Sequence, residues 1–219
     1  MKTQMKSHAT SIIEKMEDPK TPELNFEFIY KLTNESERGA ILIGASKIED
    51  YLKELILKVI PSHNKDYKNR LLDYPGPLSS FSGKIELTYA FRIIDEQVYN
   101  SLNTLRKIRN EAAHSDELFS LQENKKRLEK IYNFEDGFPE VVHNLALKHM
   151  IVMKKEVIRK AFAEKNLQEI DHEKLWNERF PNPEENESLQ EQLTIWKLAY
   201  GLTFLCLKIE AIAEEYLIP

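Results

Sequence analysis

Nine consecutive residues, 106–114, carry side chains that can act on a phosphodiester. Within them, Arg109, Asn110 and His114 form an Arg-Asn-x-x-x-His signature. An arginine keeps its charge at physiological pH, so it can neutralise a phosphate. A histidine titrates near neutrality, so it can move a proton to or from a ribose hydroxyl. The signature is therefore a candidate metal-free ribonuclease site.

The spacing limits how a single helix can present these groups. Arg109 and His114 are five positions apart, so their side chains diverge by about 140° on an ideal helix. Arg106, Asn110 and His114 follow an i, i+4, i+8 row and share one side. Two arrangements bring the arginine and the histidine to one phosphate. Either the helix ends near Ala113 and the histidine turns back, or two chains pool their residues in the cleft of a two-fold dimer.

The chemistry of such a cleft follows from the residue types. One histidine would deprotonate the ribose 2′ hydroxyl or protonate the leaving 5′ oxygen. Arg109 would stabilise charge on the phosphorane-like transition state, and Asn110 would orient the phosphate or hold the histidine tautomer. The products would be a 2′,3′-cyclic phosphate and a 5′ hydroxyl, with no metal or cofactor involved. Asn110 can equally be an ordinary polar surface residue.

The other residues also have structural interpretations. Arg109 can pair with Glu111, Glu49 or another carboxylate. His114 can cap a helix C-terminus, where a partly positive imidazole is favoured. Ser46 and Glu49 lie three residues apart on an earlier helix and can form a solvated edge. Alternatively, Glu49 supports the site by orienting Arg109 or His114.

The spacing of apolar residues predicts helices along the whole chain. A strong helix over 37–60 carries apolar residues three and four apart, from Ile41 to Val59. The helix that Asp95 caps turns one apolar stripe inward and delivers the signature. Further helices are expected from about residue 82 and over 120–132, 141–165 and 189–217. With only 6 glycines in 219 residues, the chain lacks the turns of an all-β protein. We expect an all-α fold.

The segments between these helices show no clean domain boundary. Residues 1–17 are expected to form a short helix, and 166–188 an acidic surface connector. We expect one domain made of three parts: an N-terminal helical arm over 1–36, a helical core over 37–120, and a C-terminal helical extension over 121–219 packed on the core.

Cysteine content and hydropathy indicate a soluble cytoplasmic protein. The single cysteine, Cys206, excludes an intramolecular disulfide framework and sits in an apolar stretch, where a small buried side chain is expected. The N-terminus lacks the apolar core of a signal peptide. The most apolar stretch, 198–207, is far shorter than the roughly 20 residues that cross a bilayer. We expect no membrane association.

The net charge of −5 counts mildly against general nucleic-acid binding. A nuclease of this composition would need a local basic patch on an acidic body. Arg106, Lys107 and Arg109 supply one cluster, and residues 125–127 supply another. Each cluster can also be an ordinary solvated helix face. The histidines offer no metal site, because His143 and His149 are six residues apart rather than at the spacing of paired helical ligands.

Three blocks of sequence resemble the signatures of the mannitol-operon-repressor family, in the same order. The first covers residues 37–52, the second 76–90 and the third 106–114. Together they span a little over a third of the chain. The resemblance implies a helical regulator that acts in transcriptional control.

The third block is also similar to the Arg-x4–6-His motif of the HEPN superfamily. Its members are compact helical bundles, and many are dimeric, metal-independent RNases of toxin–antitoxin, abortive-infection and CRISPR systems. The resemblance implies a HEPN-like bundle with additional C-terminal helices, with Arg109, Asn110 and His114 as catalytic residues. Some such toxins carry a tyrosine two residues after the histidine as the target of a nucleotidyl-transferring antitoxin. Asp116 stands there in this chain, so regulation by that route is not expected.

Two functional hypotheses follow. The first is an endoribonuclease of HEPN type, active as a homodimer on RNA in a toxin–antitoxin or phage-defence setting, with an antitoxin as a possible partner. The second is a non-catalytic regulator of the mannitol-operon-repressor type, which works through protein–protein contacts with a regulatory partner. RNA cleavage in the presence of a chelator would separate them.

Overall fold

The structure is a computed structural model, and it describes residues 22–61, 64–114, 119–164 and 171–216. In these residues, every regular element is helical: there are nine α-helices, two short 3₁₀ helices and no strand. The all-α expectation is therefore confirmed. The short helix expected within 1–17 lies outside the described residues, as does Asp116.

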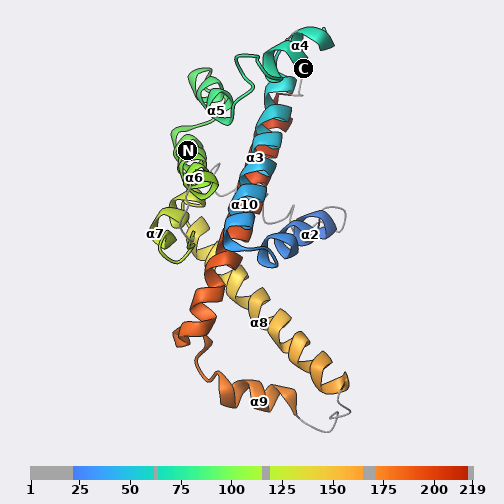
Figure 1. The fold of residues 1–219 in the computed structure, drawn as a ribbon, viewed down its shortest axis with the longest axis vertical. Helices are drawn as coiled ribbons and strands as arrows, with labels where there is room; N and C mark the ends of the chain where they lie inside the picture. The colour runs from blue at the N-terminus through green and yellow to red at the C-terminus, as the bar shows by residue number, and fades with distance from the viewer. Residues whose placement is uncertain (1–21, 62–63, 115–118, 165–170, 217–219) are drawn as a thin grey trace.

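Two long helices, α3 (Glu37–Val59) and α10 (Glu187–Glu215), lie side by side along the long axis and run in the same direction (Figure 1). The predicted apolar face of α3 is buried, and residues 198–207 of α10 are buried on all sides. A Cβ atom at Gly44 would overlap the Leu202 side chain. The small Gly44 of α3 therefore lets α10 approach closely.

The helices around this pair form two groups (Figure 1). On one side, α2 (Pro22–Thr33) packs against both α10 and α3. On the other side, α5 (Phe81–Ala90) and α6 (Glu96–His114) pack against α3 and against each other. The short α4 (Lys65–Leu72) follows α3 at the upper end of the molecule. α10 belongs to the C-terminal extension, so the extension and the central helices share one hydrophobic core.

The segment expected as one helix over 120–132 is divided. It contains α7 (Lys125–Leu128) and the 3₁₀ helix η1 (Glu129–Ile131), preceded by turns. The Ser120 hydroxyl accepts a hydrogen bond from the backbone N–H of Gln122, and the Asn124 amide donates to the carbonyl of Ser120 (2.9 Å). Side-chain bonds of this kind compete with helix formation. The helix therefore begins at Lys125, about one turn later than expected.

The C-terminal half contains a helix that the sequence analysis missed. α8 (Phe138–Glu164) and α9 (His172–Arg179) pack on each other in the lower part of the molecule (Figure 1). α9 falls in the expected connector, which also holds the 3₁₀ helix η2 (Pro183–Glu185). The Asp171 side chain caps α9, and Trp176 is buried. An eight-residue helix with one buried tryptophan is too short to show a periodic apolar pattern.

None of the helices in the described part of the chain is long and apolar enough to span a membrane.

Candidate functional site

The signature lies at the end of α6, which is fixed at both its start and its inner face. At its start, the backbone N–H of Val98 donates to the Asp95 side chain (2.8 Å), so Asp95 is the predicted cap. Along its inner face, the predicted stripe is completely buried against α3 and α5. This stripe consists of Val98, Leu102, Leu105, Ile108 and Ala112. The buried stripe turns the opposite face of α6, with its polar residues, towards solvent.

Asn110 and His114 lie on this outward side of α6, whereas Arg109 lies at the edge of the buried stripe. Arg109 is half-buried, and its Nη1 donates to the Oδ1 of the neighbouring Asn110 (3.1 Å). His114 is exposed and is the last residue of the helix. Because α6 stays helical through His114, its side chain and that of Arg109 point about 140° apart within one chain. The helix dipole also favours a histidine in the last turn of a helix. The position of His114 therefore fits a structural role as well as a chemical one.

Arg106, Asn110 and His114 share one side of the helix, as their spacing predicts. The Arg106 Nε donates to the Asn103 amide oxygen (3.2 Å), one turn earlier. The row formed by these side chains is therefore polar and lies on the surface of the molecule. A second molecule can reach it without any rearrangement of the core.

Glu111, the carboxylate within the signature, forms an ion pair with a residue of another helix. Glu111 forms an ion pair with Arg127 of α7, with an Nη2–Oε1 distance of 2.7 Å and a second hydrogen bond beside it. The bonds to Arg127 lower the pKa of Glu111, and the same bonds raise the pKa of Arg127. Glu111 is thus not the partner of Arg109, which makes no ion pair with any carboxylate of the described residues.

Glu49 and Ser46 do not join the signature among the described residues. The Glu49 carboxylate accepts a hydrogen bond from the Lys84 ammonium (2.7 Å), which also donates to the carbonyl of Ser79. The Lys84 side chain is only 4% exposed, so Glu49 neutralises a buried charge between α3 and α5. Ser46 is exposed and lines a groove between α2 and α3. Glu49 is therefore an internal ion-pair partner rather than a solvated edge.

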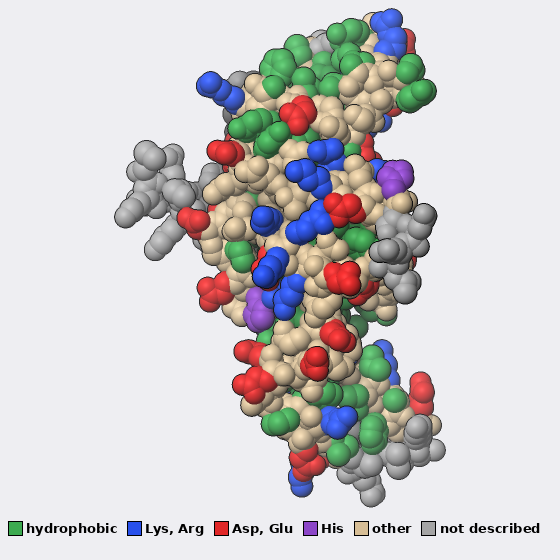
Figure 2. All heavy atoms as spheres, turned by 60° about the vertical axis from the view of Figure 1, so that its left-hand side comes forward, with side chains coloured by type: hydrophobic (Ala, Val, Ile, Leu, Met, Phe, Trp, Pro, Cys, Tyr) green, Lys and Arg blue, Asp and Glu red, His purple; other side chains and the backbone are tan. Residues whose placement is uncertain are grey.

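The two basic clusters of the sequence adjoin in the fold. α7 and η1 pack beside α6, and the Ser101 hydroxyl donates to the carbonyl of Lys130 (3.1 Å). Figure 2 shows Lys and Arg side chains gathered in a band down the middle of this face. The Lys and Arg residues of α6, α7 and η1 are Arg106, Lys107, Arg109, Lys125, Lys126, Arg127 and Lys130. An acidic protein thus has a local basic surface next to the signature.

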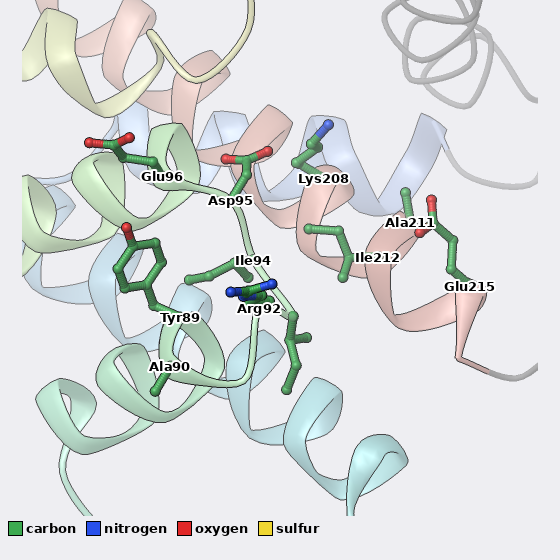
Figure 3. Close-up of a pocket in the computed structure, with 11 residues that line it drawn as sticks. Tyr89, Ala90, Arg92, Ile94, Asp95, Glu96, Lys208, Ala211, Ile212 and Glu215 are labelled. Atoms are coloured by element: carbon green, nitrogen blue, oxygen red, sulfur yellow. The ribbon is translucent and has the colours of Figure 1, made fainter.

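A cavity of about 670 Å³ lies between the α5–α6 turn and the last turns of α10 (Figure 3). Arg92 lines it with a positive φ of 56°. The backbone N–H of Ile93 donates to the carbonyl of Thr88, so this conformation is the left-handed cap that ends α5. Lys208 in the wall pairs with Glu135 (3.4 Å). Carboxylates and cations both line the cavity, so its charge selects neither anions nor cations.

Several sequence expectations outside the signature can be checked directly. Cys206 is buried and burial raises its pKa, as expected for a small core side chain. No sequence pattern indicated that His149 forms a hydrogen bond with Tyr200 and lies against the Phe26 ring at a tilted angle. Within the described residues, no group of His, Cys, Asp and Glu side chains has the arrangement of a metal site.

Comparison of the chain with models of protein families, with curated proteins and with solved structures finds no match. The resemblances to the mannitol-operon-repressor family and to the HEPN superfamily therefore rest on the three sequence blocks alone.

Proposed function

We propose that the protein is a metal-independent endoribonuclease of HEPN type, with a HEPN-like helical bundle as its core. Arg109 and His114 are its catalytic residues, and Asn110 orients the phosphate. RNA is the substrate, a homodimer is the active form, and the setting is toxin–antitoxin control or phage defence.

The observation that supports this proposal most directly is how the charged side chains in and near the signature are paired. Glu111 is neutralised by Arg127, and Glu49 is neutralised by Lys84. The guanidinium of Arg109 is left with only an amide oxygen as its hydrogen-bond partner in the described residues. A guanidinium without a carboxylate is suited to bind a phosphate, with which it forms paired hydrogen bonds.

The geometry of α6 favours a site that two protomers share. Because the side chains of Arg109 and His114 diverge on a continuous helix, a single chain does not aim both at one phosphate. In a two-fold dimer, the α6 face of one protomer meets its copy. The arginine of one protomer and the histidine of the other then flank the scissile bond. Histidine transfers the proton of the 2′ hydroxyl, and arginine stabilises the pentavalent transition state.

The second candidate is a regulator that acts through protein contacts without catalysis. It is favoured by an apolar groove of about 470 Å³ between α2, α8 and α10. Phe26, Tyr30 and Val152 expose roughly half of their surface there. Exposed apolar surface of this kind is typical of protein-binding faces.

One experiment separates the two. The full chain is incubated with single-stranded RNA and EDTA, and the product ends are identified. The proposal expects 2′,3′-cyclic phosphate and 5′ hydroxyl ends, with the rate lowered about a hundredfold or more in His114→Ala and in Arg109→Ala. Arg179→Ala, an exposed arginine on α9, is the matched control and retains the wild-type rate. Equal rates in wild type and both signature variants, or no cleavage at all, would leave the regulator as the better account.

A further inference from the structure

The Arg106 side chain is held along α6 by a hydrogen bond to an amide. Its Nε donates to the side-chain oxygen of Asn103 (3.2 Å), and the Asn103 amide donates in turn to the carbonyl of Tyr99 (3.3 Å). Arg106 is half-buried and forms no ion pair with a carboxylate of the described residues. Like Arg109, it therefore carries a charge that a phosphate can neutralise through paired hydrogen bonds.

Lys107 places a second cation next to Arg106. Its side chain is exposed. The carboxylate four residues later, at the usual spacing of a helical ion pair, is Glu111. Glu111 is already bound by Arg127, with an Nη2–Oε1 distance of 2.7 Å. This turn of α6 therefore carries two adjacent positive charges and no carboxylate within residues 103–107.

These cations adjoin a polar stripe that leads to the signature. Four polar residues of α6, at spacings of four, three and four, form the stripe: Asn103, Lys107, Asn110 and His114. The stripe faces away from the buried residues of the helix. Arg106 borders it, and the hydrogen bond to Asn103 draws the guanidinium towards it. Because all of these residues belong to one continuous helix, helix geometry fixes their order and separation.

The separation along the helix suits successive phosphates of one strand. Arg106 is four residues before Asn110, which would orient the scissile phosphate, and four residues rise by about 6 Å along an α-helix. Neighbouring phosphates of an extended single strand are separated by a similar distance. A strand whose scissile bond lies at His114 therefore brings its next phosphate to the two cations.

The start of α6 limits how far such a strand can follow the helix. Asp95 and Glu96 lie there, and their negative charges repel a phosphate backbone. The positive part of α6 begins at the turn that contains Arg106. The stripe therefore accommodates a short stretch of the strand, between Asn103 and His114.

We propose that Arg106 and Lys107 bind the phosphate next to the scissile one, so that single-stranded RNA runs along α6 from His114 towards Asn103. This inference rests on the proposed function, because it identifies the path of that substrate. The two cations make no contact with the reacting atoms. They contribute affinity and set the register of the strand, and they carry no base preference, since contacts to phosphates read no base.

Binding of uncleaved RNA tests the inference. The full-length His114→Ala protein is titrated into a labelled single-stranded RNA of about twelve nucleotides, and anisotropy is recorded over a range of salt concentrations. In this background, Arg106→Gln/Lys107→Gln is expected to bind about tenfold more weakly. The slope of log affinity against log salt should fall in magnitude by about 0.7, the value for one phosphate contact to a single strand.

A matched control removes the same charge from another surface. Lys174→Gln/Arg179→Gln changes an exposed lysine and an exposed arginine of α9, and it should leave both quantities at the values of the parent. Lys107→Gln alone, at an exposed position, should give a smaller loss of affinity in the same direction as the double variant. Unfolding curves and gel filtration of each variant check that the fold and the oligomeric state are retained.

Kinetics of the cleaving protein give a second measurement. With His114 intact, Arg106→Gln/Lys107→Gln should raise KM about tenfold and leave kcat nearly unchanged, because the lost contact is made equally in the bound substrate and in the transition state. A fall in kcat at constant KM would overturn the inference, since the two cations would then act on the chemical step.

The outcomes distinguish this inference from the proposed function. If the wild type cleaves RNA but the Arg106/Lys107 double variant keeps the parent's affinity and salt slope, the inference is wrong and the nuclease stands. If the wild type cleaves nothing but the double variant shows the expected losses, the α6 stripe is an RNA-binding surface and the nuclease is wrong. Equal losses in the α9 control would also overturn the inference, because the effect would then reflect total charge.

Discussion

Glu111, within the Arg-Asn-x-x-x-His signature of α6, forms an ion pair with Arg127 of α7, with an Nη2–Oε1 distance of 2.7 Å. The pair has two effects. It fixes α7 against the end of α6, and it removes a negative charge that would otherwise lie one turn from His114. The signature then presents a positive surface to a phosphate.

Loss of this ion pair should impair RNA binding with little cost in stability. In Arg127→Gln, Glu111 is an unpaired carboxylate beside the signature, and we expect the affinity for RNA to fall several-fold. The free energy of unfolding should drop by no more than about 1 kcal/mol, because both side chains are substantially exposed. The double variant Arg127→Gln/Glu111→Gln should recover most of the affinity. A double variant no better than Arg127→Gln would show that Arg127 itself, not the release of Glu111, supplies the effect.

A dimer with shared sites should show complementation between two inactive variants. Arg109→Ala and His114→Ala protomers are co-expressed with different tags, and the mixed dimer is purified. One of its two clefts then contains an intact arginine and an intact histidine from different protomers. The expected cleavage rate is about half that of the wild-type dimer. A mixed dimer as inactive as its parents would mean that each site is built within one chain.

Removal of Glu49 should destabilise the fold without acting on catalysis. Its carboxylate neutralises Lys84, which is almost fully buried. In Glu49→Gln the ammonium loses its compensating charge, and we expect a loss of about 2 kcal/mol in the free energy of unfolding. Lys84→Met/Glu49→Gln should recover much of it, as measured by urea denaturation.

The same variant discriminates between two roles of Glu49. If Glu49 only holds α3 and α5 together, the cleavage rate per folded molecule should be unchanged in Glu49→Gln. A fall in that rate at full folding would restore the interpretation in which Glu49 orients Arg109 or His114.

Gly201 should not tolerate a side chain. A Cβ atom there would come within 3 Å of Cβ, Cγ and Cδ1 of Tyr132, which is itself buried. We expect Gly201→Ala to lower the free energy of unfolding by about 1–3 kcal/mol through overpacking. Gly39→Ala is the control, since its Cβ would meet mainly the exposed side chains of Glu35 and Ser36. Equal stabilities of the two variants would contradict the close packing of α10 on Tyr132.

Stability should decrease as the pH falls from about 7 to about 5. Burial lowers the pKa of His143 and of His149 in the folded protein. Below the unfolded histidine value of about 6.5, the unfolded chain binds protons that the folded chain does not bind, so protonation favours unfolding. Urea denaturation at several pH values should show this slope. His143→Gln should reduce the slope, and a stability that rises towards pH 5 would refute the prediction.

The sequence by itself determined the features that depend on neighbours along the chain. The apolar stripe of α6, its Asp95 cap and the buried face of α3 all follow from spacings of three and four residues. The divergence of Arg109 and His114 also follows from helix geometry alone. These features depend on local backbone geometry and on which face must leave water.

Other features were decided only by tertiary packing. The sequence analysis left several carboxylates open as partners of Arg109, but Glu111 pairs with Arg127 and Glu49 pairs with Lys84, 35 residues away. A charged side chain pairs with whatever the packing of distant helices brings within reach, and that packing is encoded in the whole core rather than in any local pattern. The sequence therefore specified which side chains can do chemistry, and the tertiary structure decided which carboxylate pairs with which cation among the described residues.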